Sequence, residues 1–168
     1  MANIFDWNAL DQKIKATTAE YDDLSRPKAL TALAVSEIME IDIDEAVDAI
    51  TDGGHDRGVD ALYIDDRDTK NDIHVFQSKC ANSFETSKNN FPSGEIDKLT
   101  SFVTDITNHD TEALEGANDL LKAKVLDVLD ALKESNATIT VHFVSNTAPL
   151  IESEFKRIRA AFSRYRAI

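Results

Sequence analysis

The chain has 168 residues, of which 42% are hydrophobic and 29% charged, as in an ordinary globular protein with one core. It contains no apolar run of the roughly 18 residues that a membrane span needs, and no signal-peptide core. The single cysteine, Cys80, excludes an internal disulfide, so we expect a cytoplasmic protein that does not bind a membrane.

The net charge of -13 argues against a protein that holds nucleic acid by bulk electrostatics. Its distribution is uneven. The first 154 residues carry 13 basic and 31 acidic side chains, whereas no acidic residue follows Phe155, and the basic residues there are Lys156, Arg157, Arg159, Arg164 and Arg166. This pattern predicts an acidic body with one cationic element. Because the chain stops inside that helix-like stretch without a cap, we expect it to be the N-terminal part of a longer protein.

The first third of the chain predicts three helices. Residues 5 to 23 form an amphipathic pattern, and Ser25 is an expected N-cap for a second helix from Pro27 to about Met39. A third, short helix is predicted to begin with a capping-box pattern at Asp42 and to end at Gly53-Gly54. Residues 1 to 52 are therefore expected to be helical.

The period then changes from helix to strand. Residues 59 to 65 and 72 to 79 are rich in β-branched and aromatic side chains, and the polar stretch between them predicts a hairpin. Residues 81 to 94 contain Asn, Ser, Pro and Gly and are expected to form a loop.

The last third predicts two helices (residues 96 to 106 and 114 to 132), a strand (137 to 144) and a final helix (150 to about 164). The long helical connection allows the last strand to pair in parallel. We therefore expect a single α/β domain over residues 1 to 168, a sandwich whose mixed central sheet is flanked by helices and whose core begins at residue 53.

One acidic residue falls in an apolar stripe of the second helix. Glu37 lies in the middle of the pattern formed by Leu30, Leu33, Ala34 and Ile41. A carboxylate buried there must be paired or must bind a cation, because burying it bare costs several kcal/mol. The alternative, that Glu37 lies at the edge of the helix and reaches water, is equally compatible with the pattern.

Three further polar residues are expected on strand faces. Asp60 shares a face with Leu62 and Ile64, and Gln77 and Lys79 share one by the two-residue period of the next strand. If these are the same side of the sheet, the set suits Mg²⁺, which takes oxygen ligands, with a lysine to orient or deprotonate the attacking water. Alternatively, Gln77 and Lys79 simply end a strand at the surface.

The stretch ITDGGHDRGVDALYID…IHVFQSKC resembles the core of PD-(D/E)xK nucleases, in the Gln-x-Lys form of type IV, modification-dependent restriction enzymes. Residues 51 to 61, preceded by a helical glutamate, are similar to the N-terminal region of abortive-infection phage-resistance (AIPR) proteins. The resemblance covers roughly residues 30 to 80, with a weaker match at 137 to 144. It implies a restriction-endonuclease-like fold and Mg²⁺-dependent hydrolysis of DNA phosphodiesters, in defence against foreign or phage DNA.

The resemblance also implies roles for individual residues. Asp60 matches the metal-binding aspartate, Lys79 the lysine, and Glu37 the glutamate that many members supply from the preceding helix. Gln77 replaces the usual acid, so it would bind metal through its side-chain oxygen without adding charge. The expected site is thus one Mg²⁺ held by Asp60, Gln77 and Glu37, with Lys79 as the further catalytic residue. Because Gln77 stands where the family has an acid, the alternative that this domain has no catalytic activity stays open.

Other candidates have simpler interpretations. Asp56 could replace or assist Asp60, but its position between two glycines favours a turn formed with Gly54 and Gly58. Asp52 is expected to be a turn or helix-end residue. His55 lies close enough to touch phosphate, but an exposed loop residue is the simpler interpretation. The remaining histidines show no zinc spacing with Cys80, and the chain has no phosphate-binding loop of the Gly-x-x-x-x-Gly-Lys type, so no nucleotide cofactor is expected.

Three functions remain open from the sequence. The leading hypothesis is a metal-dependent endonuclease whose partner is DNA. The second is an inactive nuclease-fold module that binds nucleic acid, and the third is an acidic protein-interaction domain that mimics DNA. The sequence is compatible with a homodimer and does not decide between oligomeric states.

Overall fold

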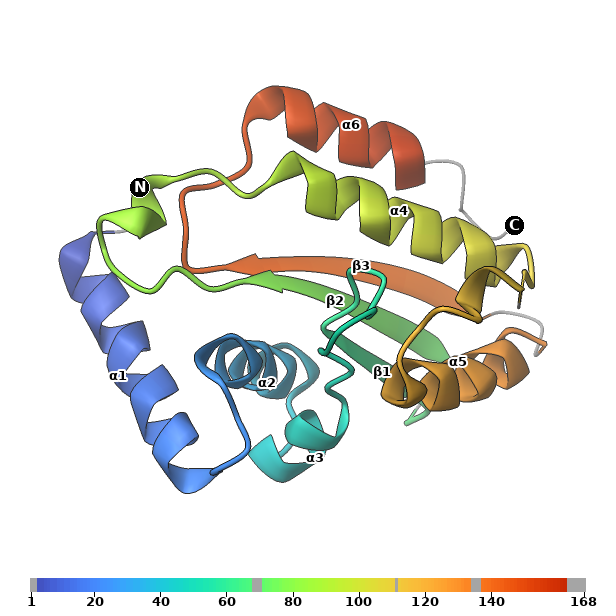
Figure 1. Ribbon diagram of the computed structural model, residues 1–168, viewed down its shortest axis with the longest axis horizontal. Coiled ribbons are helices and arrows are strands. Elements are labelled where there is room, and N and C mark those ends of the chain that lie inside the picture. Colours follow the sequence, from blue (N-terminus) through green and yellow to red (C-terminus); the bar gives the residue numbers. More distant parts are fainter. Residues whose placement is uncertain (1–2, 68–70, 111, 134–136, 163–168) are drawn as a thin grey trace.

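The structure is a computed structural model that describes residues 3–67, 71–110, 112–133 and 137–162 (Figure 1). Its elements are α1 (Ile4–Glu20), α2 (Arg26–Met39), α3 (Ile43–Asp48), β1 (Ala61–Asp65), β2 (Asp72–Lys79), α4 (Ser93–Thr107), α5 (Asp119–Leu132), β3 (Thr138–Ser145) and α6 (Glu152–Phe162), with 3-10 turns at Thr86–Lys88 and Glu112–Leu114. Within these described ranges, no helix has the length and apolar character to cross a membrane.

The three strands form one mixed sheet in the order β1-β2-β3. β1 and β2 are an antiparallel hairpin in which Leu62 faces Val75, and β3 pairs in parallel with β2. The predicted hairpin and the predicted parallel strand are both confirmed. β1 begins two residues later than predicted because Asp60 belongs to the loop that precedes it.

Helices cover both faces of the sheet, with α4 and α6 on one side and α1, α2 and α3 on the other (Figure 1). The alternation along β2 explains this arrangement, since successive side chains point to opposite faces. Ile73 and Val75 pack with residues of α4 and α5 in the largest core cluster. Phe76, which points the other way, packs against Val35 and Met39 of α2. The chain is thus a mixed α/β fold with a helix-flanked sheet.

The helix boundaries in the N-terminal third correct one expectation. Ser25 caps α2 as predicted, its hydroxyl accepting the backbone N–H of Lys28 at 3.5 Å. Asp42 makes no side-chain capping bond, and α3 ends at Asp48 rather than at the glycine pair. The reason lies in the sheet: Ile50 forms an antiparallel bridge with Ala61, so the chain must leave the helix before residue 50.

The buried face of α2 also differs from the prediction. The helix buries Ala29, Leu30, Ala32, Val35 and Met39, whereas Glu37 is exposed. Val35 and Met39 pack against Phe76 of β2, and Ala29 and Leu30 pack against Ile14 of α1, so these residues face inward and Glu37 does not. The interpretation in which Glu37 reaches water at the edge of the helix is therefore correct.

Candidate metal centre

A closed loop leads into β1 and carries the candidate site. The backbone N–H groups of Thr51 and Asp52 both donate to the carbonyl of Asp60, at 2.9 and 3.1 Å. Asp60 in turn donates its N–H to the carbonyl of Phe76 in β2, at 2.8 Å. The two ends of the loop are therefore held together at the start of the sheet, and the side chains of Asp52 and Asp60 become neighbours.

The middle of this loop is a tight turn that requires Gly58. Asp56 accepts the N–H of Gly58 on its carboxylate at 2.8 Å, so the predicted role of Asp56 in the turn is confirmed. Gly58 has φ +78°, and a Cβ at this position would lie 2.9 Å from both Gln77 Oε1 and Lys98 Cβ. Only glycine fits, because the loop passes directly against β2 and α4.

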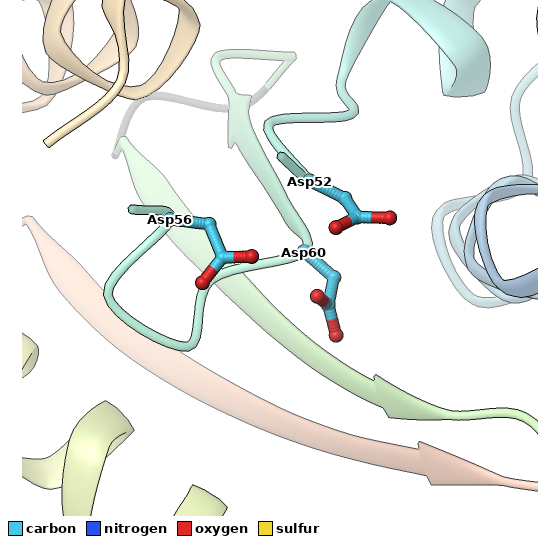
Figure 2. Close-up of side chains that lie close together, drawn as sticks. All are labelled: Asp52, Asp56 and Asp60. Atoms are coloured by element: carbon cyan, nitrogen blue, oxygen red, sulfur yellow. The ribbon is translucent and has the colours of Figure 1, made fainter. Parts of the chain in front are cut away.

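The loop brings three carboxylates together. Asp52, Asp56 and Asp60 each offer a ligand oxygen, and these atoms all lie within 4.8 Å of one another (Figure 2). None of the three forms an ion pair with any residue that the structure describes. From the sequence, Asp52 and Asp56 were expected mainly in turns, with Asp56 as an alternative to Asp60 or an addition to it, and a cluster of all three was not predicted. The signal was present in the spacing, since three aspartates recur every four residues around glycines.

Burial and like charge act together on this cluster. Asp60 is only 9% exposed, and burial raises the pKa of its carboxyl to about 6, with Asp52 and Asp56 adding to the effect. The backbone N–H of Ser78, 2.5 Å from Asp60 Oδ2, acts in the opposite direction. Burial also raises the pKa of Asp52. The ionised cluster is thus electrostatically unfavourable in the absence of a cation.

Gln77 adds a neutral oxygen beside the carboxylates. The side chain is 4% exposed, and its amide Nε2 donates to Asp60 Oδ2 at 3.1 Å and to the Ser78 carbonyl at 3.3 Å. Its Oε1 is buried and has no hydrogen-bond partner within the described part of the chain. A buried carbonyl without a donor is costly, and rotation of the amide would present this oxygen to a cation at Asp60.

Two lysines border the same cleft, which has a volume of about 280 Å³. Asp60, Gln77 and Lys79 all line it, as the sequence analysis expected from their shared strand faces. From α4 come Glu95 and Lys98, whose charged groups are paired at 3.1 Å. Lys98 could not be predicted from the sequence, because the approach of α4 to the loop is a tertiary contact.

Glu37 does not join this site. It lines a separate acidic hollow with Glu40, Asp42 and Glu45, and it is not among the residues that border the cleft of Asp60. The expectation that one cation touches Glu37, Asp60 and Gln77 is therefore not met. The carboxylates that accompany Asp60 come from its own loop.

The histidines and the cysteine take no part in the cluster. His55 is exposed in the turn, as expected. His74 and His142 bond to each other across β2 and β3, with ring nitrogens 2.9 Å apart. Cys80 is half-buried, and burial raises the pKa of its thiol. Within the described residues, the acidic loop is the one group of three or more potential metal ligands.

The basic C-terminal element lies on α4 (Figure 1). Arg157 pairs with Asp97 and Glu154, Lys156 pairs with Glu152, and Arg159 stacks over a phenylalanine ring. Its described cations therefore have partners within the chain, and none of them lines the cleft of Asp60. The two remaining arginines of the predicted basic run, Arg164 and Arg166, lie outside the described residues.

Comparisons of the chain with protein-family models, with curated proteins and with solved structures give no match.

Proposed function

We propose that this chain is a Mg²⁺-dependent endonuclease domain of the PD-(D/E)xK, restriction-endonuclease-like class, acting on DNA in defence against foreign DNA. One observation carries the proposal: the three-carboxylate cluster lies beside the amide of Gln77, whose Oε1 has no hydrogen-bond partner among the described residues, and Lys79 borders the same cleft. Acids, a neutral oxygen and an ammonium group are the set that metal-assisted phosphodiester hydrolysis needs.

The fold supports the same proposal. Asp60 directly precedes β1, and Gln77 and Lys79 end β2, so the three lie at one end of an antiparallel hairpin. Leu62, Ile73 and Val75 on that face belong to one apolar cluster. Polar groups at the end of an otherwise apolar face are more consistent with function than with packing.

The residues of the cleft would have different roles in binding the ion. Asp60, one or both of Asp52 and Asp56, and Gln77 Oε1 after amide rotation would hold the ion. Bound there, Mg²⁺ would supply charge to stabilise the phosphate in the transition state. Because the pKa of Asp60 is raised to about 6, protons compete with the cation, and affinity should rise as pH increases through this value.

Lys79 is placed to act on the water that attacks phosphorus. Once it has lost its own proton to solvent, its amine would orient that water and accept a proton from it, and the ammonium group so formed would stabilise the negative charge on the phosphoryl oxygens. The attack forms a new P–O bond as the bond to the leaving deoxyribose oxygen breaks, and the leaving oxygen takes up a proton from solvent. The proposal thus assigns Lys79 a role that an arginine or alanine cannot fill.

A cleavage assay tests the proposal. Plasmid DNA, with and without modified cytosine, is incubated with the wild type, Lys79→Ala and the control Lys133→Ala, each with Mg²⁺ and with chelator. Lys133 is an exposed residue that follows α5. We expect wild type and control to cut only with Mg²⁺, and Lys79→Ala to lose about 100-fold or more. Wild type that cuts neither substrate would contradict the proposal.

The acidic surface favours a second candidate, a protein-interaction domain that mimics DNA. A hollow of about 640 Å³ next to α2 and α3 is bordered by Glu37, Glu40, Asp42, Glu45 and Asp66, with Arg67 as its cation. This candidate predicts that the chain neither cuts nor binds DNA, so the same assay separates the two functions.

A further inference from the structure

A second hollow continues the candidate metal cleft past Lys79. It has a volume of about 290 Å³ and shares Lys79 and Cys80 with the cleft of Asp60. Its other walls come from the loop between β2 and α4 and from Thr147, after β3. We call this hollow the amide groove, because Asn82, Asn89 and Asn90 line it.

The chemistry of the amide groove differs from that of its surroundings. No carboxylate lines it, whereas the cleft of Asp60 and the hollow of Glu37 are both acidic. Asn82, Asn89 and Asn90 are exposed, and their side-chain amides make no hydrogen bond with another described residue. Each amide offers two N–H donors, which phosphate oxygens can accept, and one carbonyl acceptor, which can bond donors on base edges.

The amide groove is also preformed. Asn146 is 7% exposed and holds Ala81 from both sides, accepting its N–H at 2.6 Å and donating to its carbonyl at 3.1 Å. At the other end of the loop, Ala148 donates to the carbonyl of Asn89 at 3.2 Å and bridges Asn90. Both ends of the loop are tied to the segment after β3, so binding there would order little additional chain.

We propose that the amide groove is a subsite for a DNA strand, holding the nucleotides next to the phosphate at the metal centre. This inference rests on the proposed nuclease function. A polyanion is repelled by the acidic body of a chain with net charge -13, so a strand leaving the cleft is repelled least where carboxylates are absent. The amide groove provides such a path and shares the wall formed by Lys79 with the cleft.

The test compares paired variants. Binding of a fluorescein-labelled single-stranded oligonucleotide is measured by anisotropy with Ca²⁺ in place of Mg²⁺, so that cutting does not interfere. The double variant Asn82→Asp/Asn90→Asp puts two charges into the amide groove. The control Asn108→Asp adds charge at the other end of α4, whose 15 residues span about 22 Å.

We expect the double aspartate variant to bind about tenfold or more weakly than wild type, which corresponds to at least 1.4 kcal/mol, and the control to bind like wild type. The double alanine variant Asn82→Ala/Asn90→Ala should bind more weakly without changing the salt dependence, because no cation that neutralises phosphate is removed. Melting temperatures of all variants show whether each one folds.

Two results would overturn the inference. Either the double aspartate variant binds within twofold of the control, or the wild type binds no strand at all. Cleavage of plasmid with Mg²⁺, measured on the same proteins, keeps the two proposals apart. Cutting that persists unchanged in the double aspartate variant rejects the amide groove alone, whereas a wild type that binds the strand without cutting rejects only the nuclease.

Discussion

Two aspartates of this chain are almost equally buried, but the pKa of one carboxyl is lowered and that of the other is raised. Asp11 in α1 is 7% exposed and Asp60 is 9% exposed. Asp11 bonds Lys15 at 2.8 Å and Arg26 at 2.7 Å, and these cations hold the pKa of its carboxyl below the ordinary value. Asp60 has only neutral donors, and burial raises its pKa to about 6.

The comparison separates a structural carboxylate from a candidate functional one. Arg26 is the first residue of α2, so the pair with Asp11 joins α1 to α2 and is complete within the chain. Asp60 faces two further carboxylates instead, and a shift of its pKa from 3.8 to about 6 corresponds to about 3 kcal/mol against the ionised form. A bound cation would remove that cost. Burial alone therefore does not identify a site; the identity of the partners does.

The largest expected effect comes from breaking the turn that carries the carboxylates. Gly58→Ala should lower the free energy of unfolding by about 3 kcal/mol, from the left-handed backbone together with overpacking against Gln77 and Lys98. The control Gly54→Ala, where a Cβ meets nothing within 4 Å, should stay within about 0.5 kcal/mol. Urea unfolding measures both. If the two variants lose the same free energy of unfolding, the turn at Gly58 has room for a Cβ and the prediction is wrong.

Asp11→Asn is expected to destabilise the protein by about 2 kcal/mol at pH 7, between the values for exposed and buried ion pairs. The sign follows from the lowered pKa: the stabilisation is present above the unfolded pKa of 3.8 and is lost as pH falls through the folded pKa. Unfolding curves at pH 7 and pH 3 measure the difference. If the variant is as stable as the wild type at pH 7, the ion pairs of Asp11 do not stabilise the fold.

Asp60→Asn should change the free energy of unfolding in the opposite direction and raise it by about 1.5 kcal/mol at pH 7.5. This gain is part of the free energy that the raised pKa of Asp60 costs the folded state. The amide oxygen can still accept from Ser78 and Gln77, while the charge beside Asp52 and Asp56 disappears. The wild type should lose stability as pH rises from about 4 to about 6, where the unfolded carboxyl ionises before the folded one. The variant should lack this loss, and a destabilised variant would contradict the assignment.

The smallest effect is the response to metal. Mg²⁺ at several times its Kd should stabilise the wild type and Asp11→Asn by about 1 kcal/mol, which is roughly 2–4 °C in Tm for a chain of this size. Asp60→Asn should not respond. Thermal melts with Mg²⁺ and with chelator measure the shift. An equal response in all three proteins would place the cation elsewhere and leave the acidic cluster without a role.

Local pattern was sufficient for the order and type of most elements and for part of the site. The period of two placed Asp60, Gln77 and Lys79 on faces that do meet, because each strand of the hairpin presents alternate residues to one side. Ser25 was recognisable as a cap because its oxygen satisfies a backbone donor only a few residues away. The alternation of side chains along a strand and the capping bond of a helix both involve residues close together in sequence, so they can be predicted without knowing the fold.

The remaining parts of the site depended on contacts between distant segments. Asp52 and Asp56 join Asp60 because the loop closes on a backbone carbonyl, a hydrogen bond that no periodicity encodes. Lys98 enters the cleft because α4 packs against Gly58. Glu37 is left out because the rotation of α2 about its axis is set by which of its residues fit against the neighbouring elements. The sequence by itself thus determined the strands and the positions of Gln77 and Lys79 on β2, and tertiary packing decided how Asp60 and the neighbouring carboxylates gather in the loop before β1.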